Sequence, residues 1–412
     1  MSGGEKQKIY GEAEAVLRNG RRVEAEGSIC YTMPSPGSYP YQWLWDSCFH
    51  AIALAHIDPR FGQEELQTLL MRQFANGMVP HMTYWHEGPL HWYHWGIAGT
   101  SSITQPPMLA YATLRVFEKT QDEQFLQHMF QPLMNYYRYL LERRDPWKRG
   151  LVGIINPDES GEDNSPRFDA LLHFTPAVSP EEHHARRFKL VETYRQSGFD
   201  ESSMRDSFWV EEAGFNAILV ANLDALAKLA QLVGHEEDAV FCREKSALVR
   251  DAMRTHLFED GRFWSYAPFA HGGTRLKVAT WTHFLPLFAG IYTPEEAKRV
   301  VEEDIRNEET FRAPFGIRTV SKREPAYSIG GYKEDDARAF GGDWRGAVWH
   351  APHWFLFHGL NRYGFSDDAQ WVRDMTHSLI ARTGFREHIH PETGEGGGAR
   401  DFTWGTLVLD ME

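Results

Sequence analysis

Residues 215–234 have the sequence FNAILVANLDALAKLAQLVG and are followed at once by HEEDAV at residues 235–240. Leu219, Leu223 and Leu226 recur at the spacing of one helix face, which predicts a helix with a buried face. The glycine that closes the first stretch commonly ends helices, and the acidic residues after it suit the first turn of another helix. The sequence therefore predicts two consecutive helices joined by a short turn.

The same pairing recurs along the chain. Paired helices are expected at 104–120 and 122–144, 215–233 and 236–258, 279–289 and 294–306, and 346–363 and 367–382. Other helices are expected at 47–56, 62–75 and 399–409, with a helical turn at the N-terminus. About twelve helices result, with few convincing strands and no fixed repeat period. We expect a closed all-α ring, because the aromatic and acidic loops would converge only there; an open superhelix is the alternative.

Composition limits the class of protein. The 412 residues are 42% hydrophobic and contain no linker-like stretch, which predicts one domain over residues 1–412. A formal net charge of -14 argues against nucleic acid or a membrane surface as the main partner. Three widely spaced cysteines and a polar N-terminus without an apolar segment predict a cytoplasmic protein. The sequence leaves the oligomeric state open, and a homo-oligomer is possible.

Two acidic loops indicate the chemistry. Residues 156–168, NPDESGEDNSPRF, place four carboxylates in six positions, and residues 386–395, REHIHPETGE, form the second loop. The chain also has 14 Trp, 16 Tyr and 26 Phe. Aromatic faces stack on sugar rings, and a carboxylate pair can cleave a glycosidic bond by acid/base chemistry. The two loops therefore predict a sugar-cleaving site.

The helical pattern lapses between residues 156 and 212. This segment is far longer than the usual connection of roughly 4 to 6 residues. It holds too many aromatic and aliphatic residues for a solvated tail, so we expect a folded insertion that covers the pocket, with short helices near 180–196 and 201–207.

Further side chains are candidates for contacts with a sugar. Trp43, Trp45 and Asp46 could supply stacking and hydrogen bonds, although core packing and helix capping would use the same residue types. Gln105 could be a polar contact at a helix mouth or a helix cap. Trp344 and Arg345 could form a substrate wall and orient a carboxylate, with a structural salt bridge as the alternative for the arginine.

Cofactor motifs are not found in the sequence. None of the histidine clusters matches a zinc pattern, and we expect no metal. There is no Gly-rich phosphate loop, nucleophile elbow or dinucleotide fingerprint, so we expect no cofactor.

Five segments together resemble the signature segments of glycoside hydrolase family 63. They are residues 39–47, 104–107, 159–168, 342–346 and 387–395. The size is similar to that of the compact bacterial branch that includes mannosylglycerate and glucosylglycerate hydrolases, and the resemblance spans about residues 39–405. It implies an (α/α)6 barrel and inverting hydrolysis of α-glycosides.

The resemblance also implies roles for individual residues. Asp163 would be the general acid and Glu387 the general base, with Tyr39 among the sugar contacts. Relatives often have Trp where this chain has Asp158. Physical reasoning leaves Glu392 and Glu395 as rival bases.

Neighbouring charges bear on the general acid. Glu159 and Glu162 would favour a proton on Asp163, whereas Arg167 would oppose it. Arg167 also belongs to the densest positive stretch of the chain, in which at least one cation is expected to bind an aglycone carboxylate. That stretch comprises Arg167, Arg186, Arg187, Lys189, Arg195 and Arg205. Surface ion pairs would use the same residues.

The sequence thus predicts an inverting α-glycosidase that acts on α-mannosylglycerate or α-glucosylglycerate, with a small-molecule sugar as its partner. An α-glucosidase for a neutral oligosaccharide, a sugar epimerase with a histidine pair and a non-catalytic sugar-binding protein are the alternatives.

Overall fold

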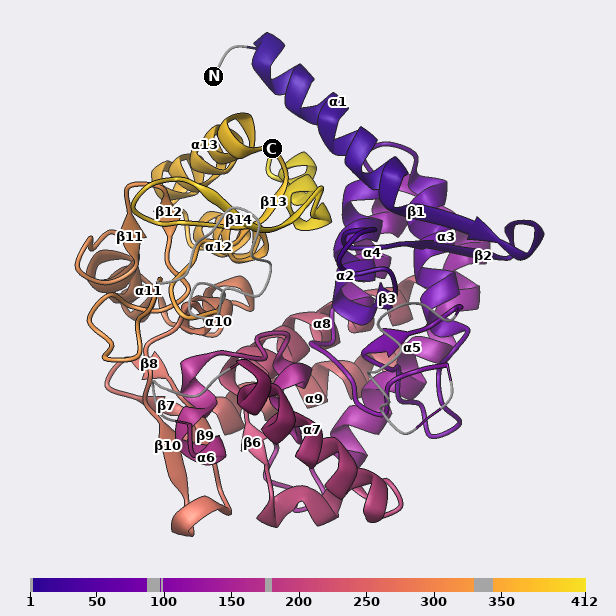
Figure 1. Cartoon of the computed structure of the whole chain (residues 1–412). Helices are drawn as coiled ribbons and strands as arrows, with labels where there is room; N and C mark the ends of the chain where they lie inside the picture. The colour runs from indigo at the N-terminus through magenta and orange to yellow at the C-terminus, as the bar shows by residue number, and fades with distance from the viewer. Residues whose placement is uncertain (1–2, 87–96, 98, 175–179, 330–343) are drawn as a thin grey trace.

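The computed structural model describes residues 3–86, 97, 99–174, 180–329 and 344–412. Figure 1 shows a mainly helical molecule whose chain travels once around a ring. The colour passes clockwise from indigo at the upper right, through magenta at the bottom and orange at the left, to yellow at the top.

Six helical elements form a closed circuit of contacts. They are α2 (Leu44–Leu54), α4 (Leu109–Thr120), α8 (Ala213–Leu232), α10 (Leu285–Phe288), α12 (His350–Arg362) and η8 (Thr403–Asp410). Each packs against the next, and η8 packs against α2. Every residue of α2 and η8 is buried, as expected for helices that are surrounded by protein. These elements are the inner helices.

Other helices lie outside this circuit and are buried on one side only. They are α1 (Gly3–Gly20), α3 (Pro59–Leu70), α5 (Glu123–Arg143), α9 (Glu236–His256), α11 (Pro294–Val300) and α13 (Ser366–Thr383). In α5, Phe125, Met129 and Leu133 are buried at helical spacing, so the helix presents one apolar face to the core. α9 packs on α8 and α13 on α12, as the predicted pairs require, and α3 packs on α2 in the same way.

Several predicted boundaries are confirmed. α5, α8, α9 and α13 agree with the predicted ranges to within two residues. The Asp122 side chain caps α5 by accepting hydrogen bonds from the amides of Gln124 and Phe125. The capping box of Thr293 and Glu296 begins α11, which passes into a π-helical turn at Val301–Ile305.

Several predicted helix starts are wrong. α4 begins at Leu109 rather than 104, because the two prolines at 106–107 disfavour helical geometry before them. Helix is absent at 279–280, where Thr280 is extended and bridges Val320; 3-10 and α-helical turns follow at Trp281–Phe284 and in α10. α12 begins at His350 because residue 348 pairs with residue 389 instead.

Both ends of the chain also differ from expectation. The N-terminal segment is an 18-residue helix rather than a turn, and Ile9, Ala13 and Leu17 pack in a cluster with residues of α2 and η8. The predicted helix at 399–409 starts as strand β14 (Gly396–Arg400), paired with β13 (Arg386–Ile389).

The strands are short and mostly form two-stranded pairs. One sheet has four strands in the order β10 (Thr274–Leu276), β9 (Ser265–Ala267), β6 (Val210–Glu211) and β5 (Gly153–Ile154). The pairs are β1 (Arg21–Glu24) with β2 (Ile29–Thr32), β3 (Gln42–Trp43) with β4 (Met82–Thr83), β7 (Phe258–Glu259) with β8 (Arg262–Phe263), β11 (Arg312–Ala313) with β12 (Gly316–Ile317), and β13 with β14.

The described parts of the predicted insertion, residues 156–174 and 180–212, are folded. It contains η2 (Pro157–Ser160), η3 (Pro166–Phe168), α6 (Asp169–Leu172), α7 (Pro180–Gln196) and η4 (Glu201–Asp206). The predicted short helices are thus confirmed, the second of them as a 3-10 helix. Leu190, Val191 and Tyr194 bury one side of α7 in the main core.

α8 is long and apolar enough to cross a membrane by composition alone. Within its most apolar window, 89% of the residues are buried inside the protein, as in the core helix of a globular domain.

A buried carboxylate joins the inner helices toward their C-terminal ends. Asp410 of η8 accepts hydrogen bonds from His56 after α2, Arg115 of α4, and Trp354 and His358 of α12, at 2.7 to 3.0 Å. Burial alone would raise the pKa of Asp410. The bonds from the two histidines and the charge of Arg115 outweigh burial and hold the pKa well below its usual range.

We therefore expect Asp410→Asn to destabilise the protein by roughly 2 to 4 kcal/mol, because an amide leaves buried donors without a charged acceptor. Denaturant unfolding measures the change. Asp224→Asn is the matched control, since Asp224 is half-exposed in its pair with Arg250 and should cost under about 1 kcal/mol.

The pH dependence of this stabilisation follows from the direction in which the fold shifts the pKa of Asp410. A carboxyl whose pKa is depressed in the folded state stabilises the fold above its unfolded pKa of about 3.9 and loses this effect as the pH falls. The difference between wild type and Asp410→Asn should therefore be largest near neutral pH and shrink below about pH 4. Equal losses for the two variants at neutral pH would contradict this role for Asp410.

Candidate active site

The acidic loop at 156–168 rests on an indole ring. Asn156 begins η2 by accepting a hydrogen bond from the Asp158 amide, and Gly161 then takes a φ of 74°. A Cβ atom at Gly161 would lie 2.3 Å from the Trp45 ring, so the backbone approaches as closely as glycine allows. Trp45 is 2% exposed, which makes it a platform under the loop.

Each carboxylate of this loop is paired with an arginine. Glu159 is fully buried and accepts bonds of 2.7 and 2.6 Å from Arg144, which is also buried. The amides of Thr104 and Ile155 donate to the same carboxylate. A buried carboxylate needs such compensation, and Glu159 is thereby committed to the framework.

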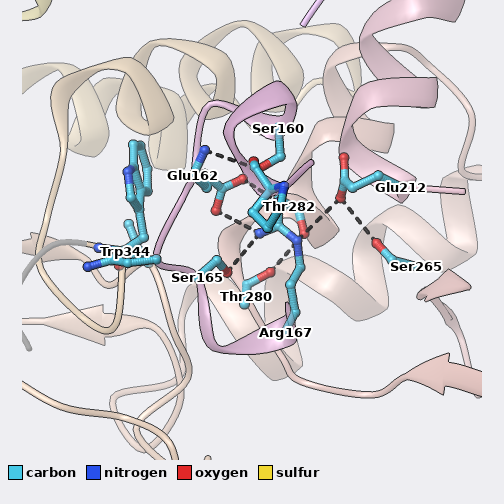
Figure 2. Close-up of polar contacts among 12 residues, drawn as sticks. Ser160, Glu162, Ser165, Arg167, Glu212, Ser265, Thr280, Thr282 and Trp344 are labelled. Atoms are coloured by element: carbon cyan, nitrogen blue, oxygen red, sulfur yellow. Dashed lines mark hydrogen bonds and ion pairs between the residues drawn. The ribbon is translucent and has the colours of Figure 1, made fainter. Parts of the chain in front are cut away.

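Glu162 belongs to a second buried network, shown in Figure 2. Arg167 donates to both Glu162 oxygens at 2.8 and 3.0 Å and to the Ser165 hydroxyl at 2.9 Å. Its Nε atom lies 3.6 Å from Glu212, which also accepts a bond from Ser265. Burial raises the pKa of Glu162, although Arg167 acts against this.

This network revises the expectation for Arg167. Its guanidinium is buried and engages Glu162 and Glu212, so the structure places it in the support of the loop. The arginine that pairs with Asp163 is Arg187 of α7. Closeness in sequence favoured Arg167, whereas folding of the insertion brings α7 across the loop.

Asp163 is the most exposed carboxylate of the loop, with 43% of its side chain accessible. The Nη1 atom of Arg187 lies 2.8 Å from Asp163 Oδ2 and 2.5 Å from Asp158 Oδ1. One nitrogen therefore bridges two carboxylates. Burial, supported by the charge of Asp163, raises the pKa of Asp158 to about 6, and Arg187 opposes this shift.

Three histidines interact electrostatically with Asp163 and Arg187. Burial and the charge of Arg187 lower the pKa of His183 to about 3 and of His184 to about 4. Burial lowers the pKa of His81 to about 3, with the charge of Asp163 acting against burial. These rings are therefore uncharged near neutral pH. Among the described residues, Arg187 and Asp158 carry the charges paired with Asp163 or with its arginine.

Glu387 lies on β13 and is 8% exposed. The Tyr39 hydroxyl donates to its Oε1 atom at 2.6 Å, and the Ala399 amide donates to Oε2 at 2.7 Å. Gly398 allows this close approach, because a Cβ atom there would lie 2.4 Å from Oε2. The carboxylate is thus oriented through both oxygens.

The two rival carboxylates lie at the turn of the same hairpin. Glu392 is 38% exposed and forms an ion pair with Arg318. Glu395 accepts a bond from the Thr393 hydroxyl. The buried and doubly bonded carboxylate of the loop is Glu387.

A run of aromatic contacts connects the two acidic loops. Tyr39 packs its ring on Phe402, Phe402 packs on Trp404, and Trp404 packs edge-on to Trp45 at 5.1 Å between ring centres. Tyr39 holds Glu387, and Trp45 supports the loop of Asp163. The N-terminal ends of α2 and η8 thereby bring both candidate catalytic residues to one end of the ring.

Trp344 and Arg345 attach the last signature segment to this site. The Trp344 ring stacks on Trp349 at 4.2 Å, and its amide donates to Asn164, next to Asp163. Arg345 forms two hydrogen bonds with Asp169 of α6, which is the salt bridge foreseen as its alternative role. Gly342 and Asp343 of this segment lie outside the described residues.

The remaining candidates lie between these groups. Gln105 accepts a bond from the Trp45 amide in the first turn of α2, which is the capping alternative. Asp46 is buried and accepts a 2.6 Å bond from the Trp404 indole. Burial raises the pKa of Asp46 to about 6, with His50 and Trp404 acting against it. Trp43 is partly buried and packs edge-on to Tyr39.

Sequence reasoning missed Arg144, Glu212 and His81. Arg144 follows the end of α5, where a basic residue is expected merely to favour the helix dipole. Glu212 precedes α8 and caps it by accepting a hydrogen bond from the Phe215 amide, a local role that does not reveal its place beside Arg167. His81 carries no local signal, because its position beside Asp163 depends on the fold.

Known proteins match this chain over nearly all of its length. A family model described as the mannosylglycerate hydrolase MGH1-like glycoside hydrolase domain matches residues 39–405. The mannosylglycerate hydrolase of Thermus thermophilus is 33% identical over 96% of this chain and 98% of its own length. The glucosylglycerate hydrolase of Mycolicibacterium hassiacum is 28% identical over 92% of this chain and 93% of its own length.

Solved structures agree with these matches. The crystal structure of the family 63 mannosylglycerate hydrolase from Thermus thermophilus in complex with Tris and D-glycerate has a TM-score of 0.87. It is 30% identical and covers 98% of this chain and 99% of its own. Neutral trehalase Nth1 from Saccharomyces cerevisiae, at 17% identity and a TM-score of 0.59 over 97% of this chain and 79% of its own, shares the fold. The chain therefore belongs to the mannosylglycerate and glucosylglycerate hydrolase-like group of glycoside hydrolase family 63.

Proposed function

We propose that this protein is an inverting α-glycosidase that hydrolyses α-mannosylglycerate or α-glucosylglycerate to the free hexose and glycerate. The observation that carries the proposal is the contrast between two carboxylates at one end of the ring. Asp163 is accessible at the edge of a rigid loop, and Glu387 is buried and oriented by Tyr39 and the Ala399 amide.

The environment of each carboxylate suits one of the two proton transfers of the reaction. Asp163 would donate its proton to the glycosidic oxygen while the bond to the anomeric carbon breaks. Glu387 would accept a proton from a water molecule that attacks the opposite face of the sugar, as inversion requires for carboxyls roughly 6.5 to 9.5 Å apart. Trp43 and Tyr39 would offer aromatic surface to the sugar ring.

The architecture supports the same proposal. The circuit of six inner helices with outer helices packed against it fits an (α/α)6 barrel. The side chains of the site come from the starts of inner helices and the loops before them, so a ring with parallel inner helices would gather them at one mouth. We further propose that the protein acts in the cytoplasm, which its three buried free cysteines suit.

Arg187 is our candidate for recognition of the glycerate carboxylate. Of the six cations in the positive stretch, it is the one with an ion pair to Asp163. Arg186 contacts Glu182 and carbonyls of the insertion, Arg195 is exposed beside Glu192, and Arg205 lies over Trp147 and Phe269. The Thermus thermophilus enzyme was crystallised with D-glycerate, which supports an anionic aglycone.

The catalytic roles can be tested by isosteric substitutions. We expect Asp163→Asn and Glu387→Gln each to lower kcat on the hexosylglycerate substrate by about 10²-fold or more, because the first loses the proton donor and the second the base. Circular dichroism and thermal melting should stay close to wild type. Glu392→Gln is the control and should keep its turnover; loss of activity in this variant together with an active Glu387→Gln would reassign the base.

Aglycone recognition calls for a pair of substrates that differ only in charge. The wild type should have a higher kcat/KM for a hexosylglycerate than for the matching hexosylglycerol, because an arginine binds a carboxylate through charged hydrogen bonds. Arg187→Ala should reduce this preference about 10-fold or more, and Arg195→Ala should keep it. Equal kcat/KM values for the two substrates in the wild type would contradict an anionic aglycone and favour a neutral oligosaccharide.

A further inference from the structure

We propose that Asp158 is a positioning residue for the general acid: it holds Arg187 between itself and Asp163, and its charge sets the pH at which Asp163 loses its proton. The geometry is specific, because the same Nη1 atom of Arg187 contacts Asp158 and Asp163. This inference rests on the proposed function, in which Asp163 donates a proton.

The charges explain why a second carboxylate is needed. A general acid must carry its proton in the free enzyme, and an arginine at 2.8 Å favours the ionised form instead. Asp158 supplies a compensating negative charge on the same arginine. Removal of Asp158 or of Arg187 should therefore change how firmly Asp163 holds its proton.

Within the described ranges, the other charged groups near Asp163 have partners of their own or are uncharged. Within the loop, Glu159 is neutralised by Arg144 and Glu162 by Arg167. From the other packed elements, α7 presents His183 and His184, and the segment before α4 presents His81; burial keeps all three rings uncharged near neutral pH. Arg345 is bound by Asp169.

Asp158 itself is built into a fixed position. It lies in the first turn of η2, and its amide donates to Asn156. Arg187 reaches it from α7, whose buried face includes Leu190, Val191 and Tyr194. Because both partners sit on anchored elements, Asp158 fixes the place of the guanidinium as well as compensating its charge. Burial also raises the pKa of Asp158 to about 6, against the charge of Arg187.

The inference predicts shifts of opposite sign in two variants. Asp158→Asn leaves the charge of Arg187 wholly to Asp163, so the basic limb of the kcat/KM profile should move to lower pH, by about one pH unit. Arg187→Gln removes the cation, so the same limb should move to higher pH. A purely structural role would lower the rate at every pH and leave the limb in place.

The experiment records kcat/KM against pH for wild type, Asp158→Asn, Arg187→Gln and a control, Glu201→Gln. Glu201 is a buried carboxylate of the same insertion that pairs with Arg143, so its loss should affect thermal stability and not the limb. Profiles are taken with whichever α-hexoside the wild type cleaves, charged or neutral. Opposite shifts in the two variants would confirm the role of Asp158.

Two other outcomes would each overturn a different claim. If the basic limb of the kcat/KM profile stays in place in both variants, or moves in the same direction in both, the role of Asp158 is refuted. The proposed function would still stand, because the wild type hydrolyses the substrate. A wild type that cleaves no α-hexoside at any pH would instead refute the proposed function, and the positioning role with it.

Discussion

The site depends on the compensation of four carboxylates by three arginines. Asp158, Glu159, Glu162 and Asp163 lie within six residues, and Glu159 and Glu162 are almost fully enclosed. Without partners, their mutual repulsion and desolvation would unfold the loop. Arg144, Arg167 and Arg187 come from the end of α5, the loop itself and α7, so neutralising the loop also ties the insertion to the ring.

This compensation assigns different tasks to residues that look alike in the sequence. Glu159 and Glu162 each accept hydrogen bonds from the two Nη atoms of one buried guanidinium, which gives them a structural role. Asp163 shares a single nitrogen with Asp158 and remains accessible. The partner and the exposure of each carboxylate, more than its residue type, decide which one can meet a substrate. At the other end of the inner helices, Asp410 accepts hydrogen bonds from four donors, His56, Arg115, Trp354 and His358.

Much of this fold follows from local patterns, and the failures have physical causes. Apolar spacing and acidic first turns predicted α5, α8, α9 and α13, because their burial repeats with the helical period. The starts of α4 and α12 were missed, since prolines and long-range strand pairing override the helical pattern there. α1 was missed because only one narrow face is apolar among charged residues.

In the candidate site, too, local patterns predicted some features and missed others. The motifs placed Asp163 and Glu387 in two loops, and the hairpin geometry explains why Glu387 differs from Glu392 and Glu395. The cation beside Asp163 was placed on Arg167, four residues away, whereas Arg187 reaches it from a helix more than twenty residues later. Such pairings depend on how the insertion folds back, which no local pattern encodes.

The stereochemistry of hydrolysis tests the central claim most directly. If Asp163 protonates the leaving oxygen and Glu387 activates water on the opposite face, an α-hexosylglycerate must first release the β anomer. Proton NMR during the first minutes of the reaction, before mutarotation, distinguishes the two anomers. We predict β-hexose as the first product, and initial appearance of the α anomer would contradict the assignment of the two carboxylates.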